Sequence, residues 1–88
     1  MKVITTKQFI KDVEKELNKS LQIELGDIIE ELYRINRLEE IKNLKKLKGF
    51  KTAYRIRLRD FRIGFIYEND EIILSRVMNR KEVYRYFP

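Results

Sequence analysis

The stretch from Tyr54 to Arg59 constrains the fold more than any other part of the chain, because apolar residues and arginines alternate in it without a break. Strict alternation at a period of two predicts a β-strand with one buried face. Arg55, Arg57 and Arg59 then project from the opposite face, about 6.6 to 7 Å apart along the strand. The sequence therefore predicts a strand that is apolar on one side and strongly cationic on the other.

The alternation resumes after Asp60 and continues from Phe61 to Tyr67. A tight turn at Asp60 would place the apolar rows of both strands on the same face of a hairpin. Arg62 and Gly64 would then join the arginine face, where a glycine lets another backbone approach closely. We therefore expect a hairpin whose outer surface gathers guanidinium groups from both strands.

A second turn and a third strand complete an antiparallel meander. Residues 68–71 read Glu-Asn-Asp-Glu, and Asn and Asp tolerate the left-handed backbone of a tight turn. Residues 72–78 are apolar enough to form the third strand. At the start of the chain, residues 3–5 predict a short strand, which we place at the edge of the sheet.

Two amphipathic helices are expected before the meander, over residues 6–18 and 21–35. Thr5 and Gln8 have the spacing of a capping box for the first helix, and an asparagine or serine in the segment 18–20 can cap the second. The apolar stripes of both helices need a partner, and the apolar face of the meander is the only large one. The sequence therefore predicts an α+β fold of order β-α-α-β-β-β, with the helices on one face of an antiparallel sheet and the other face open and basic.

The connector over residues 37–50 and the tail over residues 79–88 are less regular. Leucine or isoleucine recurs every third residue from Leu38 to Leu47, which favours short helical turns or an irregular packed segment. The tail is basic and aromatic and can form a short helical turn. We expect its aromatic pair at 86–87 to pack onto the domain.

Composition limits the chemistry that is available to this chain. Its 88 residues predict a single domain, residues 1–88. It has no cysteine and no histidine, so the usual transition-metal ligands and the commonest general acid and base are missing. We therefore expect neither a metal nor a cofactor. No apolar run approaches the length of a membrane span and no signal peptide opens the chain, so we expect no membrane partner and a cytoplasmic protein.

The positive charge is concentrated in the second half of the chain. Residues 1–47 hold ten Lys and Arg against nine Asp and Glu, whereas residues 48–88 hold ten against five, and seven of those ten cations are arginine. The planar guanidinium fork suits phosphate oxygens better than an ammonium group does. An arginine-rich sheet face therefore favours a nucleic acid or another polyanion as the partner. Arg76 and Arg85 are interpreted as surface or partner-contacting residues.

Three stretches of the sequence together resemble a known family. They are LKKLKG at 44–49, YRIRLRDFRIGFIY at 54–67 and NRKEVY at 79–84. In this order and at these spacings they resemble the RelE/ParE superfamily of toxins from bacterial type II toxin–antitoxin systems, and the resemblance covers essentially the whole chain. It implies a toxin that a cognate antitoxin protein neutralises by wrapping it.

The resemblance implies one of two activities. RelE-like members cut messenger RNA in the ribosomal A site, whereas ParE-like members block DNA gyrase and cut no RNA. Carried over by motif, the catalytic residues of the RNA-cutting branch fall at five positions: Arg55, Arg57, Arg62, Arg80 and Tyr84. Four further residues are expected to contact RNA: Lys48, Lys51, Arg59 and Lys81.

The expected reaction uses the 2′-hydroxyl of the RNA as the nucleophile on the adjacent phosphate and needs no metal. Arg62 is the candidate for clamping the phosphate, with Arg55 and Arg57 in support. RNA-cutting relatives often carry lysine at those two supporting positions, and arginine rarely gives up a proton. Tyr84 could stack on a base or transfer a proton, and Lys48 is a candidate for handling a proton or contacting phosphate.

Three readings remain open on the sequence alone. The first is an endoribonuclease that acts on mRNA and the ribosome, which the joint presence of the five motif residues favours. The second is a gyrase inhibitor without nuclease activity. The third is a module that only binds a partner, in which the arginine row is the solvated face of a sheet.

Overall fold

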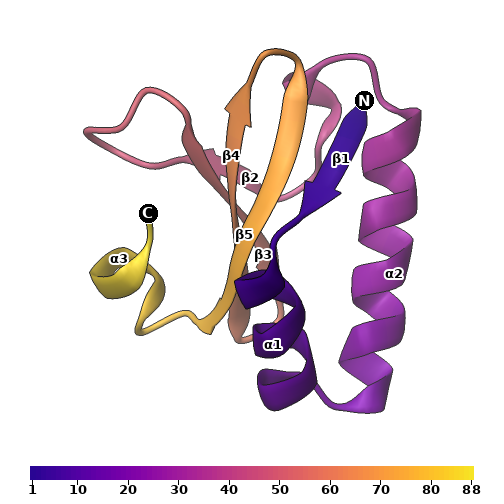
Figure 1. Ribbon diagram of the computed structural model, residues 1–88, viewed down its shortest axis with the longest axis vertical. Coiled ribbons are helices and arrows are strands. Elements are labelled where there is room, and N and C mark those ends of the chain that lie inside the picture. The colour runs from indigo at the N-terminus through magenta and orange to yellow at the C-terminus, as the bar shows by residue number, and fades with distance from the viewer.

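The computed structural model describes residues 1–88 as one five-stranded sheet with two long helices on one face and a short helix near the end of the chain (Figure 1). The strands are β1 (Lys2–Thr5), β2 (Leu44–Lys46), β3 (Ala53–Leu58), β4 (Phe61–Glu68) and β5 (Glu71–Asn79). The helices are α1 (Lys7–Glu16), α2 (Lys19–Arg34) and α3 (Val83–Tyr86), with a 3-10 turn at Leu38–Glu40. None of the helices is long and apolar enough to cross a membrane.

The strand order across the sheet is β1-β5-β4-β3-β2. Strands β3, β4 and β5 form the antiparallel meander that the alternating pattern predicts, and the α+β class is confirmed. The edge strand β1 pairs with β5 in parallel, so the sheet is mixed rather than wholly antiparallel. No tight turn links these two strands, because both helices and three strands lie between them in the chain, so nothing local dictates their relative direction.

Two tight turns fix the register of the meander. Leu58 pairs with Phe61 across the first turn, and Arg59 in that turn has a φ of 55°. Asn69 and Asp70 in the second turn have φ values of 52° and 59°, the left-handed pair that suits a two-residue hairpin. Both turns lie where the sequence predicts them. Their closure sets which side chains of neighbouring strands lie opposite one another.

The helix caps agree only in part with the prediction. Thr6, not Thr5, caps α1, because its Oγ1 accepts a hydrogen bond of 3.1 Å from the backbone N–H of Phe9. The expected capping box is therefore wrong, and the side chain of Gln8 instead donates to the Asp12 carboxylate. The asparagine cap of α2 is confirmed, since Asn18 Oδ1 accepts from the N–H of Leu21 at 2.9 Å.

The main core lies between the helices and the sheet. It joins the apolar stripes of α1 and α2 to the inward face of β3, β4 and β5, as the alternation predicts. Its fully buried side chains on the sheet are Ile56, Ile63, Phe65, Ile72, Leu74 and Val77. Because successive side chains of a strand point to opposite faces, Arg55, Arg57 and Arg62 project from the other side of the sheet.

A second, smaller cluster lies on the opposite face of the sheet. The tail turns back after β5, and α3 brings Val83 and Phe87 against the sheet (Figure 1). These two residues pack with Leu47, Ala53 and Met78. The tail therefore covers part of the face that the sequence analysis expects to be open, while the basic part stays uncovered.

The two tail aromatics behave differently. Phe87 is 5% exposed, so its expected packing is confirmed. Tyr86 is 55% exposed, and the guanidinium of Arg85 lies 5.9 Å from its ring centroid, so the prediction that Tyr86 packs onto the domain is wrong. Tyr86 ends the helix and Phe87 is its C-cap with an extended backbone, so the two adjacent rings point in different directions.

A partly buried ion pair joins α1 to β5 at an irregularity in the sheet. The register between β4 and β5 shifts after Gly64, and Arg76 lies beside this shift. Its Nε donates to Asp12 Oδ2 at 2.7 Å, and the backbone N–H of Val77 donates to the same oxygen at 3.0 Å. Asp12 is buried. Arg76 stays 32% exposed while it makes this structural ion pair, so it is a half-buried residue and its contact with a partner protein stays a prediction.

Candidate functional site

The register of β3 and β4 brings the predicted arginines together. Arg57 pairs directly with Arg62, and Arg55 pairs with Gly64. Like charges placed opposite one another on a sheet are destabilising, so folding alone would not select this arrangement. The hairpin therefore holds at least three guanidinium groups on one patch of surface, where an anion would relieve their repulsion.

Arg62 lies at the centre of this patch. Burial lowers its pKa from the ordinary value, and the neighbouring charges of Arg55, Arg57 and Arg80 lower it further. Its Nη1 donates hydrogen bonds of 2.9 Å to the backbone carbonyls of Arg59 and Phe61, which fixes the direction of the side chain. Arg80, which follows β5, is one of the charges that lower the pKa of Arg62. It therefore lies in the same patch as the strand arginines.

Tyr84 brings the tail into the same cluster. Its side chain is exposed, and a hydrogen bond from Arg55 lowers the pKa of its phenol. Burial acts in the opposite direction, and the charges of Arg55, Lys45 and Arg62 add to the lowering. The five residues of the predicted catalytic set, Arg55, Arg57, Arg62, Arg80 and Tyr84, are therefore gathered at one site.

Asn43 and Lys45 belong to the site but are absent from the sequence-based set. Asn43 has a φ of 61°, and its carbonyl accepts hydrogen bonds of 3.3 Å from Arg55 Nη1 and from the backbone N–H of Arg57. Lys45 lies on β2 directly opposite Arg55. The period-three leucines of the connector conceal this short strand. Residues 44–47 read Leu-Lys-Lys-Leu, which does not alternate, so no pattern in the sequence marks this strand.

Three hollows adjoin the cluster, and two of them are lined by more than one of its arginines. The larger, of about 720 Å³, is lined by Arg57, Arg59, Arg62 and Arg80 together with acidic residues of α2. The smaller, of about 290 Å³, is lined by Asn43, Leu44, Lys45, Arg55 and Arg57. Arg57 lines both. The surface can therefore accept an extended anionic ligand that passes from one hollow into the other.

Arg59 differs from the other predicted contacts because it already has a partner. Its Nη2 lies 3.0 Å from Glu24 Oε1 on α2, and the hydrogen bond to that carboxylate raises the pKa of Arg59. Its positive φ in the turn directs it toward the helix rather than along the arginine row. It therefore lies at the rim of the larger hollow with its charge largely compensated.

Three further lysines that the sequence predicts as RNA contacts lie outside the cluster. Lys48 and Lys51 are exposed in the loop between β2 and β3, which projects from the domain in Figure 1. Lys81 is exposed in the turn before α3. None of the three lines the hollows described above. Their role stays a prediction.

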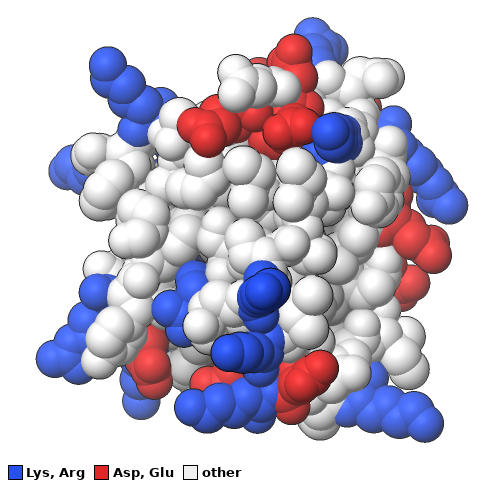
Figure 2. All heavy atoms as spheres, viewed as in Figure 1, with Lys and Arg blue, Asp and Glu red and all other residues white.

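Charge is segregated along the molecule. Figure 2 shows acidic side chains gathered around the turn between β4 and β5, where Glu68, Asp70 and Glu71 lie. The turn between β3 and β4, which carries Arg59, lies at the other end of β4. A polyanion is therefore attracted toward the β3–β4 end of the sheet and repelled from the opposite end.

Comparisons with known proteins identify relatives of this chain, although no family model matches it. The toxin RelE3 of Methanocaldococcus jannaschii is 42% identical over 89 residues, covering all of both chains. The toxin–antitoxin complex RelB–RelE from Methanococcus jannaschii aligns with a TM-score of 0.80 at 38% identity, over 97% of this chain and 99% of that one. The RelE–RelB complex from Pyrococcus horikoshii has a TM-score of 0.71 at 23% identity, over 90% and 93% of the two chains, and supports the fold.

The fold and the clustered basic site thus define a small toxin domain of the kind found in RelE–RelB pairs. The identity of 42% over the full length of a curated RelE toxin establishes the family as well as the fold. The chain belongs to the RelE family of toxins.

Proposed function

We propose that this toxin is a metal-independent endoribonuclease that cuts mRNA on the ribosome in the cytoplasm. The observation that carries the proposal is the convergence of Arg55, Arg57, Arg62 and Arg80 with a tyrosine whose phenol pKa is lowered. Attack of the RNA 2′-hydroxyl on the adjacent phosphate needs positive charge near the phosphate and a group that accepts the proton. This cluster supplies both.

The arginines would hold the scissile phosphate. Arg62 is the central clamp, because the charges of three other arginines act on it and backbone carbonyls hold its direction. The charges of Arg55, Arg57 and Arg80 lower the pKa of Arg62, which shows that the guanidinium groups repel one another. A bound phosphate would therefore relieve this repulsion.

Tyr84 would accept the proton from the 2′-hydroxyl. The hydrogen bond from Arg55 favours the phenolate, so a larger fraction of Tyr84 is ionised at neutral pH than for an ordinary tyrosine. The 2′ oxygen then attacks phosphorus, and the bond from phosphorus to the 5′ oxygen breaks. The products are a 2′,3′-cyclic phosphate and a 5′-hydroxyl.

A cognate antitoxin is the second proposed partner. The solved complexes from Methanococcus jannaschii and Pyrococcus horikoshii are named as pairs of RelB with RelE. An antitoxin that covers the arginine cluster would block RNA from reaching it. The relatives above are named as RelE toxins or RelE–RelB pairs and none is named as a gyrase inhibitor, so the gyrase alternative gains no support.

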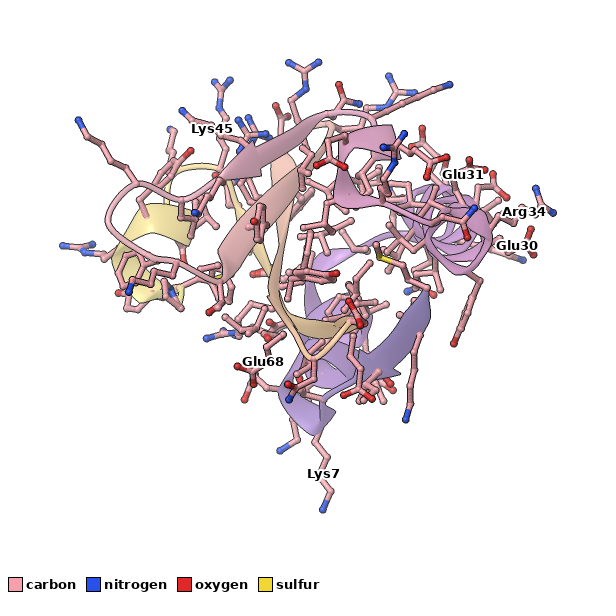
Figure 3. All side chains as sticks on the ribbon, turned by 90° about the horizontal axis from the view of Figure 1, so that it is seen from above. Lys7, Glu30, Glu31, Arg34, Lys45 and Glu68 are labelled. Atoms are coloured by element: carbon pink, nitrogen blue, oxygen red, sulfur yellow. The ribbon has the colours of Figure 1, made fainter.

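Induction in bacterial cells tests the proposal. We expect growth arrest together with breaks in translated messages, and rescue when a cognate antitoxin is co-expressed. Arg62→Ala should relieve the arrest, whereas Arg34→Ala, which removes an exposed arginine on α2 (Figure 3), should not. Arrest with intact messages would contradict the proposal.

A further inference from the structure

The proposed reaction lacks one component if only the motif residues take part. When the 5′ oxygen leaves phosphorus it needs a proton, and a positioned general acid lowers that barrier. The arginines of the cluster do not readily release a proton, because guanidinium stays protonated in proteins. Tyr84 is already assigned to the 2′-hydroxyl. A group outside the motif set must therefore protonate the leaving oxygen.

Lys45 lies in the right place for this task. It pairs with Arg55 across β2 and β3, and it lines the smaller hollow with Asn43, Arg55 and Arg57. Its charge acts on the phenol of Tyr84, which places it beside the proposed base. Figure 3 shows Lys45 among nitrogen-tipped side chains near the tail. A phosphate held by Arg55 would therefore lie within the reach of a flexible lysine side chain.

The ammonium group of Lys45 is also available. It makes no ion pair, whereas Lys2 is bonded to Glu71, and its residue is exposed at the end of the sheet. Lys46, the next residue, pairs with Tyr54 and so points to the opposite face of the strand. The two adjacent lysines therefore share exposure and charge but differ in the face that they present.

Resting on the proposed nuclease function, we propose that Lys45 is a further catalytic residue, the general acid of the cleavage reaction. Its ammonium gives a proton to the 5′ oxygen as the bond between phosphorus and that oxygen breaks. The proton from the 2′-hydroxyl goes to Tyr84, and the 2′ oxygen forms the new bond to phosphorus. Water then restores the proton to Lys45 and removes the one on Tyr84.

A sulfur-substituted message tests this role directly. Ribosomes are programmed with a synthetic mRNA that carries either the natural 5′ oxygen or a sulfur at the cut site, because a thiolate leaves without protonation. With the oxygen substrate, Lys45→Met should lower the single-turnover rate by about 100-fold or more, whereas the matched variant Lys46→Met should cut at the rate of the wild type. With the sulfur substrate, Lys45→Met should cut within a few-fold of the wild type.

The outcomes separate this inference from the function on which it rests. If the wild type cuts neither substrate, the nuclease function fails and the role of Lys45 fails with it. If the wild type cuts and Lys45→Met equals Lys46→Met on the oxygen substrate, Lys45 is not catalytic. If Lys45→Met is slow on both substrates, its role is to bind or position the phosphate and the general-acid role is overturned.

Lys45→Arg, which keeps the charge, should behave like Lys45→Met. Equal thermal unfolding midpoints exclude misfolding as the cause.

Discussion

The ring of Phe87 packs directly against the backbone of Gly64, so closely that a Cβ at position 64 would lie 2.8 Å from Cδ2 of the ring. The sequence predicts that another backbone approaches Gly64, but the group that lies against it is the ring of Phe87. Gly64 makes room for the tail of the same chain. Because Tyr84 lies in that tail three residues before Phe87, this contact helps to position the proposed base.

Gly64→Ala should displace the tail. The added methyl group meets an aromatic ring, and overpacking of this kind costs about 1–3 kcal/mol. We expect a lower unfolding free energy and a larger fall in cleavage rate than the stability loss explains, because Tyr84 moves. Gly26→Ala is the control, since its Cβ would meet nothing within 4 Å and alanine favours the helix. A Gly64→Ala variant with wild-type cleavage would show that the tail position is unimportant.

Arg62→Ala should lower the cleavage rate by about 100-fold to 1,000-fold, the range seen when one donor to a developing charge is removed. Its unfolding midpoint should rise slightly or stay the same, because the change relieves repulsion from Arg55, Arg57 and Arg80. Single-turnover cleavage and thermal unfolding measure the two effects. An active Arg62→Ala enzyme would place the phosphate clamp elsewhere.

The pH dependence of cleavage should report Tyr84. A base must be deprotonated, so the rate rises with pH through the pKa of Tyr84, which is lowered from its usual value near 10. Tyr84→Phe should remove this rise. Arg55→Ala should move it to higher pH, because the hydrogen bond from Arg55 is the largest cause of the lowering. A pH profile that is unchanged in both variants would rule out Tyr84 as the base.

Asp12→Asn should destabilise the fold by about 1–3 kcal/mol, the usual range for losing hydrogen bonds to a charged group, because the partner Arg76 stays 32% exposed and can be solvated. Burial acts to raise the pKa of Asp12, but hydrogen bonds from Arg76, Gln8 and Val77 outweigh it, and the pKa is lowered. The stabilisation from this carboxylate is therefore present above its unfolded pKa of about 3.9 and is lost as the pH falls through the lower folded pKa.

Unfolding by denaturant at several pH values checks this account of Asp12. The wild type should lose stability below about pH 4 more steeply than Asp12→Asn, which cannot titrate at this position. Equal slopes for the two proteins would show that the carboxylate does not carry the acid sensitivity. Glu14→Gln, which changes an exposed carboxylate on the same helix, should retain the wild-type slope.

The alternation of side chains made the centre of the site predictable. A period of two decides which face each residue of β3 and β4 takes, and a tight turn then decides which residues lie opposite. The pairing of Arg57 with Arg62 follows from those two local rules. The roles of Arg80 and Tyr84 came from the resemblance to the family, since nothing in the tail itself fixes where it folds.

Features that depend on distant contacts were not predictable. The carboxylate of Asp12 binds Arg76, 64 residues away, and no local pattern couples a helix to a strand over that distance. The strand β2 is only three residues long and its leucines also suit helical turns, so Lys45 was not assigned to the site. The contact of Phe87 with Gly64 depends on how the tail folds back, which composition does not reveal.

The central claim is that the clustered arginines and Tyr84 cut RNA, and the chemistry of the cut ends tests it most directly. Purified toxin is added to ribosomes programmed with a defined mRNA, and the fragments are identified by mass spectrometry. Our account predicts a 2′,3′-cyclic phosphate on the upstream fragment and a 5′-hydroxyl on the downstream one, both absent with Arg62→Ala. An intact message, or ends that carry a 5′-phosphate, would contradict it.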